Sequence, residues 1–574
     1  MFYCKQNLDC TEEKKQFEER VSRDSQTRST VMNNLRAILC FVPVAVIIVN
    51  IYLVTQYRLF SVIPYPRLPL DIAKRNALTR DALPINKAYN VTSLTAEYLR
   101  NVTISSRFLS PDLTKVTVVP HPDVIRVGDS FQVNIQLFCT DGKPVNMGGD
   151  YLKMWLKEPD LQANVNGHVK DHGNGTYTGV VLLPWKGHPE VTVSIANTRH
   201  HISLIMRYLE EHGTLNTMAS KFIDASGKYM EDLVCSPKPD VDLEGCGFRD
   251  RCNSTNYNYG LPWFCCKPKS KFLTCDDIKT QESRDHTSLS KIAVDVSKNH
   301  KHIKVMSVKT KVLEGVKGNG HLMSPPLPCR NHPPGATWQE QTPSGYYYKK
   351  SWVNLKCKSE VIDYKSCLKN RNVVVLGDSN SRGVYDIIKE RTSAIEQTSH
   401  YTKGKPWHKL LRALNTESNI DLMWAPHNPP FYVGPHQSLD TMRSVGNWLD
   451  RVSHDKPNVV IIHLFYHLTR TTLSVFRAFV KDARAGVDRL LARDPGSTVI
   501  IQGPHSITFK KVLEPIDYLR RCQEDIWYQE FLGSHEKVYY VRNWDRTSGM
   551  ENVNMHPQGQ AMLDLSNEML SYFC

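Results

Sequence analysis

A short stretch in the last third of this 574-residue chain most constrains its fold. The β-branched run Val373–Leu376 predicts a buried strand, which breaks into Gly377-Asp378-Ser379 before a helix-forming sequence. In an open α/β sheet, such a strand–turn–helix exposes a side chain at the carboxyl edge, so Ser379 is a candidate nucleophile. The loop before the last helical stretch carries His556-Pro557 and can reach the same edge. Serine and base together predict acyl transfer or ester hydrolysis.

The residues from 329 to 574 alternate between strand-like and helix-like runs. Apolar residues at helical spacing extend over Leu473–Arg493. Because strands that alternate with helices form parallel sheets with right-handed crossovers, we expect an α/β domain here. Its predicted strands are Val373–Leu376, Ile420–Trp424, Val459–Phe465, Thr498–Gln502 and Val538–Val541.

The N-terminal part contains an uncharged segment, Ala37–Val54, whose 18 residues are just enough to cross a bilayer as a helix. In the stretch just before it, Arg20, Arg23, Arg28 and Arg36 stand against Asp24 alone, and the positive-inside rule then favours a cytosolic N-terminus. We therefore expect a cytosolic tail over residues 1–36, an uncleaved signal anchor over 37–57 and a stem over 58–110. The remainder of a single-pass type II protein would then lie in a lumen, and secretion is the alternative.

Glycosylation acceptors and cysteines agree with a lumenal location. The Asn-x-Ser/Thr acceptors all follow the anchor, at Asn90, Asn101, Asn174 and Asn253. Twelve of the 15 cysteines also follow it, six of them between Cys235 and Cys275. No CxxC pair occurs there, so the spacing favours disulfides in an oxidising compartment over a zinc site, and we expect no metal.

The middle of the chain divides into three regions. Residues 111–205 predict a β-sandwich, because Phe131, Val133, Ile135 and Leu137 alternate with polar neighbours and Val191–Ile195 alternates again. The turn Asp171–Tyr177 resembles the D-x-G-x-G-x-Y turn of filamin-type immunoglobulin-like repeats. A cysteine-rich module follows over 206–275, and a basic linker over 276–328.

The net charge of +14 is spread along the chain. Nucleic acid is not an expected partner, because neither a zinc spacing nor a motif of stacking aromatic residues accompanies the charge. A basic surface also suits anionic glycans or a membrane surface.

Several segments, in the same order, resemble the neurexophilin and PC-esterase domain (NXPE) family. They are the Asn-Gly-Thr-Tyr of the sandwich, Pro-Trp-Phe-Cys at 262–265, the Gly-Asp-Ser block, Leu-Phe-Tyr-His at 464–467, Met-His-Pro at 555–557 and the terminal Tyr-x-Cys. The resemblance implies an SGNH/GDSL-type (PC-esterase) domain over 329–574 and a neurexophilin-like module. It also implies the addition or removal of acyl groups on glycans, including acetylation of sialic acids on mucin-type glycoproteins.

The same chemistry assigns a role to each residue around Ser379. His556 would take the serine proton. The backbone amides of Ser379 and Asn380, which follow the turn at Gly377, would face the oxyanion. SGNH enzymes usually carry an aspartate three residues before the histidine. Val553 stands there, so the orienting acid comes from elsewhere or is absent. We prefer Asp545, because Trp544-Asp545 at the end of the last strand matches a Trp-Asp that the family also carries.

Four further residues complete the predicted site. His427 or His467 would add a hydrogen-bond donor, and Arg382 would pair with a substrate carboxylate. Asn428 stands where the family carries a glycine, which leaves open whether its backbone amide reaches the oxyanion.

Three functions remain open from the sequence. The first is a lumenal O-acyltransferase on glycoprotein glycans, with a tail, anchor, stem and catalytic head like those of Golgi glycan-modifying enzymes. No cofactor would be bound tightly, and acetyl-CoA would be an acetyl donor. The second is a carbohydrate O-acyl esterase with the same machinery. The third is a silent neurexophilin-like protein that binds a partner through its immunoglobulin-like domain.

Overall fold

The computed structural model describes residues 109–120, 125–247, 250–284, 303–309, 320–339, 343–360, 362–398, 408–430, 434–507, 517–533 and 535–574. The predicted tail and anchor, almost all of the predicted stem, and both Asn90 and Asn101 lie outside these ranges. No helix among the residues so described has the length and apolar character needed to cross a bilayer.

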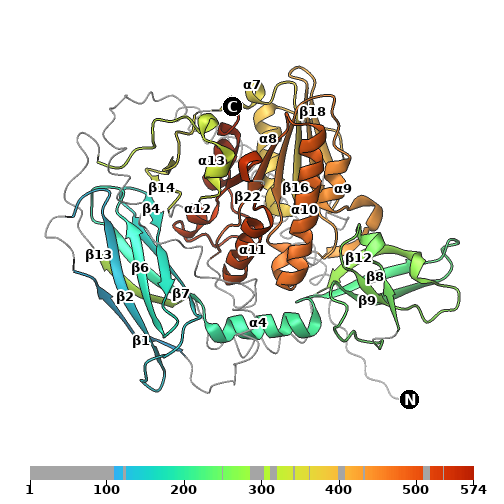
Figure 1. The fold of residues 1–574 in the computed structure, drawn as a ribbon, viewed down its shortest axis with the longest axis horizontal. Coiled ribbons are helices and arrows are strands. Elements are labelled where there is room, and N and C mark those ends of the chain that lie inside the picture. Colours follow the sequence, from blue (N-terminus) through green and yellow to red (C-terminus); the bar gives the residue numbers. More distant parts are fainter. Residues whose placement is uncertain are drawn as a thin grey trace, which may run out of the picture. The chain divides into compact units, whose positions relative to one another are not determined.

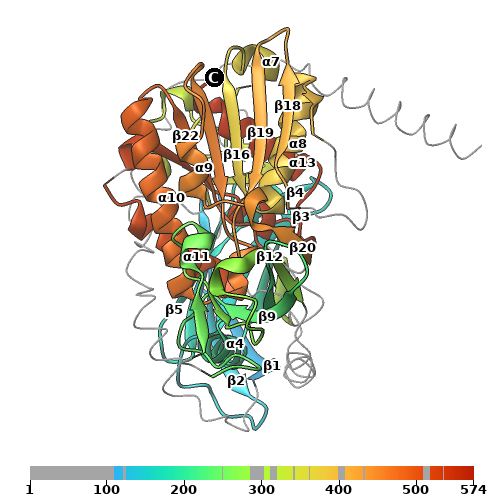
Figure 2. The same cartoon turned by 90° about the vertical axis from the view of Figure 1, so that its right-hand side faces the viewer.

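The C-terminal part folds around one seven-stranded sheet, whose strands lie next to one another in Figure 2 and are seen in Figure 1 after a turn of 90°. Five of its strands run parallel and confirm the five predicted strands: β19, β16, β21, β22 and β23. At one end of the sheet, β18 runs antiparallel to β19, and the edge strand β17 runs antiparallel to β18. In spatial order the strands are β17 (Ile395–Glu396), β18 (Leu411–Asn415), β19 (Ile420–Pro426), β16 (Asn372–Gly377), β21 (Asn458–His463), β22 (Thr498–Gln502) and β23 (Val538–Val541).

Both faces of this sheet are covered, because alternate residues of each central strand enter different apolar cores. Val374 and Leu376 of β16 pack in the core that contains α9, α10 and α11, whereas Val373 and Val375 pack in the core that contains α8 and α13. The helices of this part are α7 (Tyr364–Cys367), α8 (Ser379–Thr392), α9 (Val445–Asp450), α10 (Leu473–Arg493), α11 (Asp517–Glu530), α12 (Trp544–Ser548) and α13 (Gln560–Ser571). The prediction for α10 is confirmed over its full length.

The predicted β-sandwich is present and consists of two sheets that share one core. The alternating residues of β2 are all buried at 1% exposure or less. One sheet contains β1 (Leu109–Val118), β2 (Ser130–Cys139), β6 (Thr176–Leu182) and β5 (His168–Asp171). The other contains β13 (Ile303–Lys309), β7 (Glu190–Asn197), β3 (Tyr151–Glu158), β4 (Ala163–Asn166), β14 (Gly345–Tyr348) and β15 (Ser351–Asn354).

The cysteine-rich module has a sheet of its own, and three disulfides cross-link it as the cysteine spacing predicted. They join Cys235 to Cys265, Cys246 to Cys266 and Cys252 to Cys275. Two more bonds, Cys329–Cys357 and Cys367–Cys574, lie in the C-terminal part. The module sheet contains β10 (Arg251–Asn253), β11 (Phe264–Cys266), β9 (Met230–Ser236), β8 (Thr217–Ile223), β12 (Ile278–Arg284) and β20 (Gly434–Ser438).

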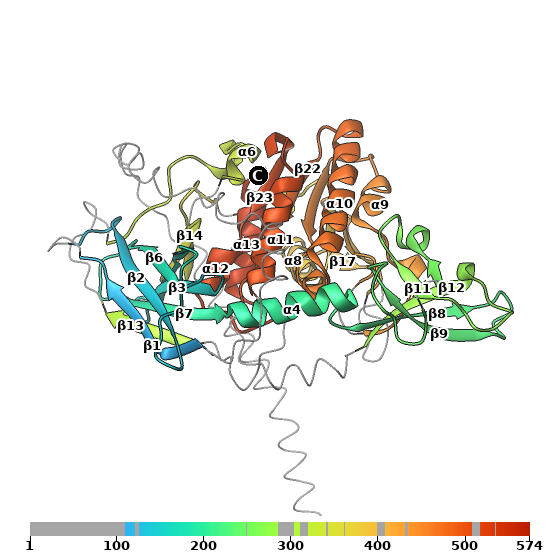
Figure 3. The ribbon, with the colours of Figure 1, turned by 60° about the horizontal axis from the view of Figure 1, so that its bottom comes forward.

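The sheets do not follow the predicted boundaries along the chain. Helix α4 (Arg199–His212) spans the boundary at 205 and leads from β7 to β8, as Figure 3 shows. The expected linker supplies β12 to the module and β13 to the sandwich. After the short helix α6 (Pro334–Thr337), the hairpin β14–β15 returns to the sandwich sheet, where Tyr347 pairs with Asn164 of β4.

Candidate active site

The turn that carries Ser379 depends on a glycine at position 377. Gly377 ends β16 with φ +134, a conformation that side chains rarely adopt. A Cβ there would lie 1.8 Å from the backbone oxygen of His463, the parallel partner of Gly377 on β21. Only glycine therefore lets the strand turn tightly at this point and start helix α8 at Ser379.

Ser379 and His556 meet at the carboxyl edge of the sheet. The distance from Ser379 Oγ to His556 Nε2 is 2.7 Å, a direct hydrogen bond. Ser379 is only 9% exposed, whereas His556, in the loop before α13, is exposed. The structure thus brings the predicted nucleophile and the predicted base into the geometry that proton abstraction requires.

The charges around His556 come from Asp378 and Arg382. Although the residue is exposed, its neighbours exclude part of the water around the ring, and this desolvation lowers the pKa of His556. Asp378 opposes the shift by attraction, and the positive Arg382 lowers the pKa further. His556 is therefore a neutral imidazole at neutral pH, which is the form that accepts a proton.

Asp378 is itself fixed by three neighbours. It is 1% exposed and caps α8, with Oδ1 accepting the backbone N–H of Asn380 at 2.8 Å. Its Oδ2 accepts the backbone N–H of Tyr466 at 3.0 Å, and His463 Nε2 lies 3.7 Å from Oδ1. From the sequence, Asp378 has no predicted role in the chemistry, although its place directly before Ser379 is a visible signal.

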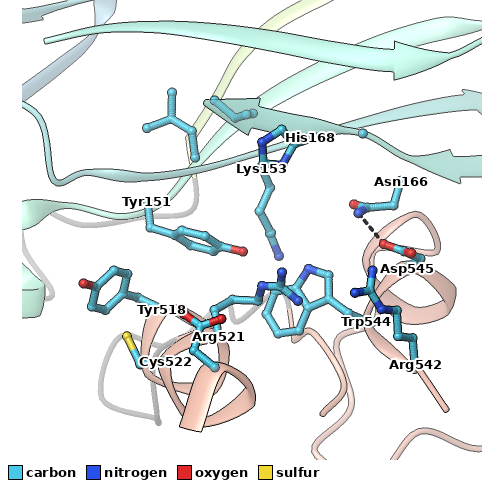
Figure 4. Close-up of a pocket in the computed structure, with 14 residues that line it drawn as sticks. Tyr151, Lys153, Asn166, His168, Tyr518, Arg521, Cys522, Arg542, Trp544 and Asp545 are labelled. Atoms are coloured by element: carbon cyan, nitrogen blue, oxygen red, sulfur yellow. Dashed lines mark hydrogen bonds between the residues drawn. The ribbon is translucent and has the colours of Figure 1, made fainter. Parts of the chain in front are cut away.

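Asp545 has other partners than the one expected for it. Its Oδ1 accepts from Asn166 Nδ2 on strand β4 at 2.8 Å, and its Oδ2 accepts the backbone N–H of Ser344 at 2.8 Å. Figure 4 shows the bond to Asn166 in a pocket between sandwich strands and helices α11 and α12. Among the described residues, no hydrogen bond joins Asp545 to His556. Both carboxylate oxygens of Asp545, the expected orienting acid, thus accept hydrogen bonds from Asn166 and Ser344.

The amide of Asn380 is also engaged elsewhere than predicted. Its N–H donates to the helix-capping carboxylate of Asp378 and is therefore not free to face an oxyanion. The side chain of Asn380, 3% exposed, makes no hydrogen bond through Oδ1 or Nδ2 within the described part of the chain. An amide with unused hydrogen-bonding capacity among the described residues thus lies directly after Ser379, the predicted nucleophile.

Three buried histidines line the neighbouring strand ends: His408, His427 and His467. His427 Nδ1 lies 2.6 Å from the backbone oxygen of Asn428, which can only accept, so Nδ1 carries the proton. Burial lowers the pKa of His427, and in the neutral ring Nε2 accepts from His467 Nδ1 at 2.9 Å. A neutral His467 that donates through Nδ1 has an acceptor at Nε2. The predicted role of His467 as a hydrogen-bond donor to the oxyanion therefore does not fit this tautomer.

The electrostatics of this histidine cluster keep it uncharged. Burial, followed by His427, His408 and His556, holds the pKa of His467 well below its ordinary value. Within the described ranges, no group of three or more histidines, cysteines or acids has the arrangement of a metal site.

Arg382 lies one helical turn after Ser379, and its guanidinium carbon is 5.6 Å from the centre of the Trp424 ring. No carboxylate of a described residue pairs with it. A cation beside the nucleophile without a protein counter-charge can receive an anionic group of a ligand.

The two described glycosylation acceptors, Asn174 and Asn253, are both exposed. Asn174 belongs to the sandwich turn and Asn253 ends strand β10 of the module.

Comparison with known proteins gives two domain matches. Residues 352–574 match the domain described as NXPE family member 4-like, C-terminal domain, and residues 132–304 match the neurexophilin domain. Among solved structures, an active-site mutant of a family two carbohydrate esterase from Clostridium thermocellum is similar at 9% identity. That likeness covers 80% of this chain and 96% of the esterase, with a TM-score of 0.21, too low to carry a conclusion about this chain.

Proposed function

Because the chain belongs to the NXPE family, we propose that its α/β domain performs serine-dependent acyl chemistry on the glycans of glycoproteins. The favoured reaction is transfer of an acyl group, in particular O-acetylation of sialic acid. The observation that carries the proposal is the 2.7 Å contact between Ser379 Oγ and the neutral imidazole of His556.

The proposed reaction has two steps through this pair. In the first, His556 Nε2 takes the Ser379 proton while Oγ attacks the acyl carbonyl, and the imidazolium returns the proton to the leaving group. In the second, His556 takes the proton of an acceptor hydroxyl, which attacks the acyl-serine and regenerates Ser379. Asp378 supports both steps, since its charge favours the imidazolium that forms in each transition state.

The acceptor in this proposal carries a negative charge close to its hydroxyl group. Arg382 supports that feature, because it is a cation near the nucleophile without a carboxylate partner among the described side chains. The carboxylate of a sialic acid on a mucin-type glycan satisfies it. An activated acetyl group, for which acetyl-CoA is the proposed donor, would enter as a substrate.

Hydrolysis is the second candidate, and the exposure of His556 favours it. Water that reaches the imidazole could replace the sugar hydroxyl in the second step. The five disulfides support an oxidising lumen such as that of the Golgi, where we place the catalytic domain. A silent binding protein would have no use for the Ser379–His556 contact.

The test is mass spectrometry of sialic acids released from cells that express the wild-type chain or Ser379→Ala. A rise in O-acetylated sialic acid that Ser379→Ala removes would support transfer, and a serine-dependent fall would support hydrolysis. No difference between the two chains, at equal expression and with sialylated acceptors present, would overturn both.

A further inference from the structure

The segment after strand β19 is held by the cysteine-rich module as well as by the α/β domain. Asn428 Nδ2 donates to the backbone oxygen of Asn258 at 2.9 Å and to its Oδ1 at 2.7 Å. In return, Asn258 Nδ2 donates to the backbone oxygen of Pro429 at 3.0 Å. Both asparagines are 1% exposed or less, so water does not compete for these bonds.

Two further contacts tie the following residues to the same module. Strand β20 pairs with β12 of the module, with Thr280 opposite Ser438 and Gln281 opposite Gln437. Tyr259, directly after Asn258, receives a hydrogen bond on its hydroxyl from Arg443 Nη1 at 3.1 Å. Arg443 also forms a β-bridge with His427, so Tyr259 of the module is linked through Arg443 to His427.

The held segment reaches the reacting groups through one residue, His427. Its N–H donates to the backbone oxygen of Gly377, at 3.4 Å, in the turn that presents Ser379. Its ring accepts from His467, whose electrostatic environment includes His556. The position of Asn258 therefore bears on both the nucleophile turn and the surroundings of the base.

We propose that the cysteine-rich module is a positioning element of the active site, in which Asn258 fixes the segment His427–Pro430 against the turn that carries Ser379. The proposal rests on the function proposed above. The disulfides Cys252–Cys275 and Cys235–Cys265 anchor the strands on either side of Asn258, so its position is set by the stapled module. Catalysis then requires the module, and not only the segment that matches the NXPE C-terminal domain.

The experiment compares Asn258→Ala and Tyr259→Phe with Ser220→Ala in the full-length chain. Ser220 is the matched control, because it is fully buried in the same module and donates to Gln281 at 2.8 Å without a hydrogen bond to the 427–430 segment. The readouts are kcat, KM, melting temperature and the rate at which a fluorophosphonate probe labels Ser379.

A positioning role predicts losses in kcat and in labelling rate while KM stays within about twofold of wild type. For Asn258→Ala we expect a loss of about 10²-fold, the scale of a small misplacement of reacting groups. For Tyr259→Phe, which removes one hydrogen bond, we expect roughly fivefold. Ser220→Ala should lower the melting temperature without lowering either rate.

The inference is overturned if Asn258→Ala reacts and is labelled as fast as Ser220→Ala. If Asn258→Ala does not fold, Tyr259→Phe decides, because the loss of one hydroxyl leaves the packing of the ring intact, and wild-type rates would overturn the inference. Failure of the proposed function looks different. In that case the wild-type chain itself shows no turnover and no labelling beyond that of Ser379→Ala.

Discussion

Ser379 Oγ and His556 Nε2 lie 2.7 Å apart, although 177 positions separate the two residues in the chain. The pair is assembled by helices α8 and α13, which pack in one core through Val384, Tyr385, Met562 and Leu565. Ser379 begins the first helix, and His556 lies in the loop that leads into the second. The distance between nucleophile and base is thus set by helix packing on one face of the sheet.

Replacement of His556 by glutamine should lower kcat by at least about 10³-fold, because among the described residues Ser379 Oγ has a hydrogen bond only to the imidazole of His556. His556 is an exposed residue in a loop, so the melting temperature should change little even though its ring is partly desolvated. In the wild-type chain, kcat/KM should fall with decreasing pH as the imidazole is protonated. Since burial lowers the pKa of His556, the midpoint of that fall should lie below about 6.5. A pH profile of both chains checks this, and a midpoint above 7 would contradict it.

Asp378→Asn should move the same midpoint to lower pH and reduce kcat. The carboxylate favours the imidazolium of His556, so its loss lowers the pKa of the base and weakens the charged transition state. Asparagine retains an acceptor for one of the two backbone N–H groups that Asp378 binds, which limits the effect on folding. An unshifted midpoint in the pH profile would show that Asp378 serves only as a helix cap.

Arg382→Gln should shift this midpoint the opposite way, to higher pH, because the guanidinium lowers the pKa of His556. It should also raise KM about tenfold for an acceptor that carries a carboxylate, with little effect for a neutral analogue. Steady-state kinetics with the two acceptors make the comparison. Equal changes in KM for both would remove Arg382 from recognition of the charge.

Asp545→Asn should reduce the free energy of unfolding by roughly 1–3 kcal/mol, because it weakens the buried bonds to Asn166 and Ser344. It should leave the pH profile of kcat/KM in place. Denaturant unfolding and the pH profile are measured on the same preparation. A shifted acid limb would instead make Asp545 the orienting acid that the sequence suggested.

The buried pair Lys153–Asp517 should make stability fall in acid. Burial of Asp517 works to raise its pKa, but attraction to Lys153 and Arg520 prevails and lowers it to about 2. A depressed carboxyl pKa contributes stability above its unfolded value of about 4, and that contribution is lost as pH falls toward about 2. Asp517→Asn should lower the free energy of unfolding by about 3 kcal/mol at pH 7 and flatten its dependence on pH between about 4 and 2. An unchanged pH dependence in urea unfolding would contradict this role.

The strands and helices with a strong period were predictable from the sequence, as Thr498–Gln502 and Leu473–Arg493 show. Gly377 and Ser379 were recognisable because a local turn signal follows a buried strand. Which aspartate acts on His556 was not recognisable in the sequence. Asp545 and Asp378 look alike there and differ only in the hydrogen-bond partners that the tertiary structure gives them. Likewise, the pairing of Asn258 with Asn428 joins positions 170 residues apart, and no local pattern encodes it.

The hairpin β14–β15 has a consequence for the order of events during synthesis. It pairs with β4, which leaves the ribosome about 180 residues earlier (Asn164 against Tyr347), and β13 joins β7 in between. The six-stranded sheet of the sandwich therefore begins with β3 and stays incomplete until Asn354 has emerged. The edge of β4 that β14 later pairs with stays unpaired while the whole cysteine-rich module is synthesised. Premature release of the nascent chain before that residue leaves an open sheet edge, a template for association with other chains.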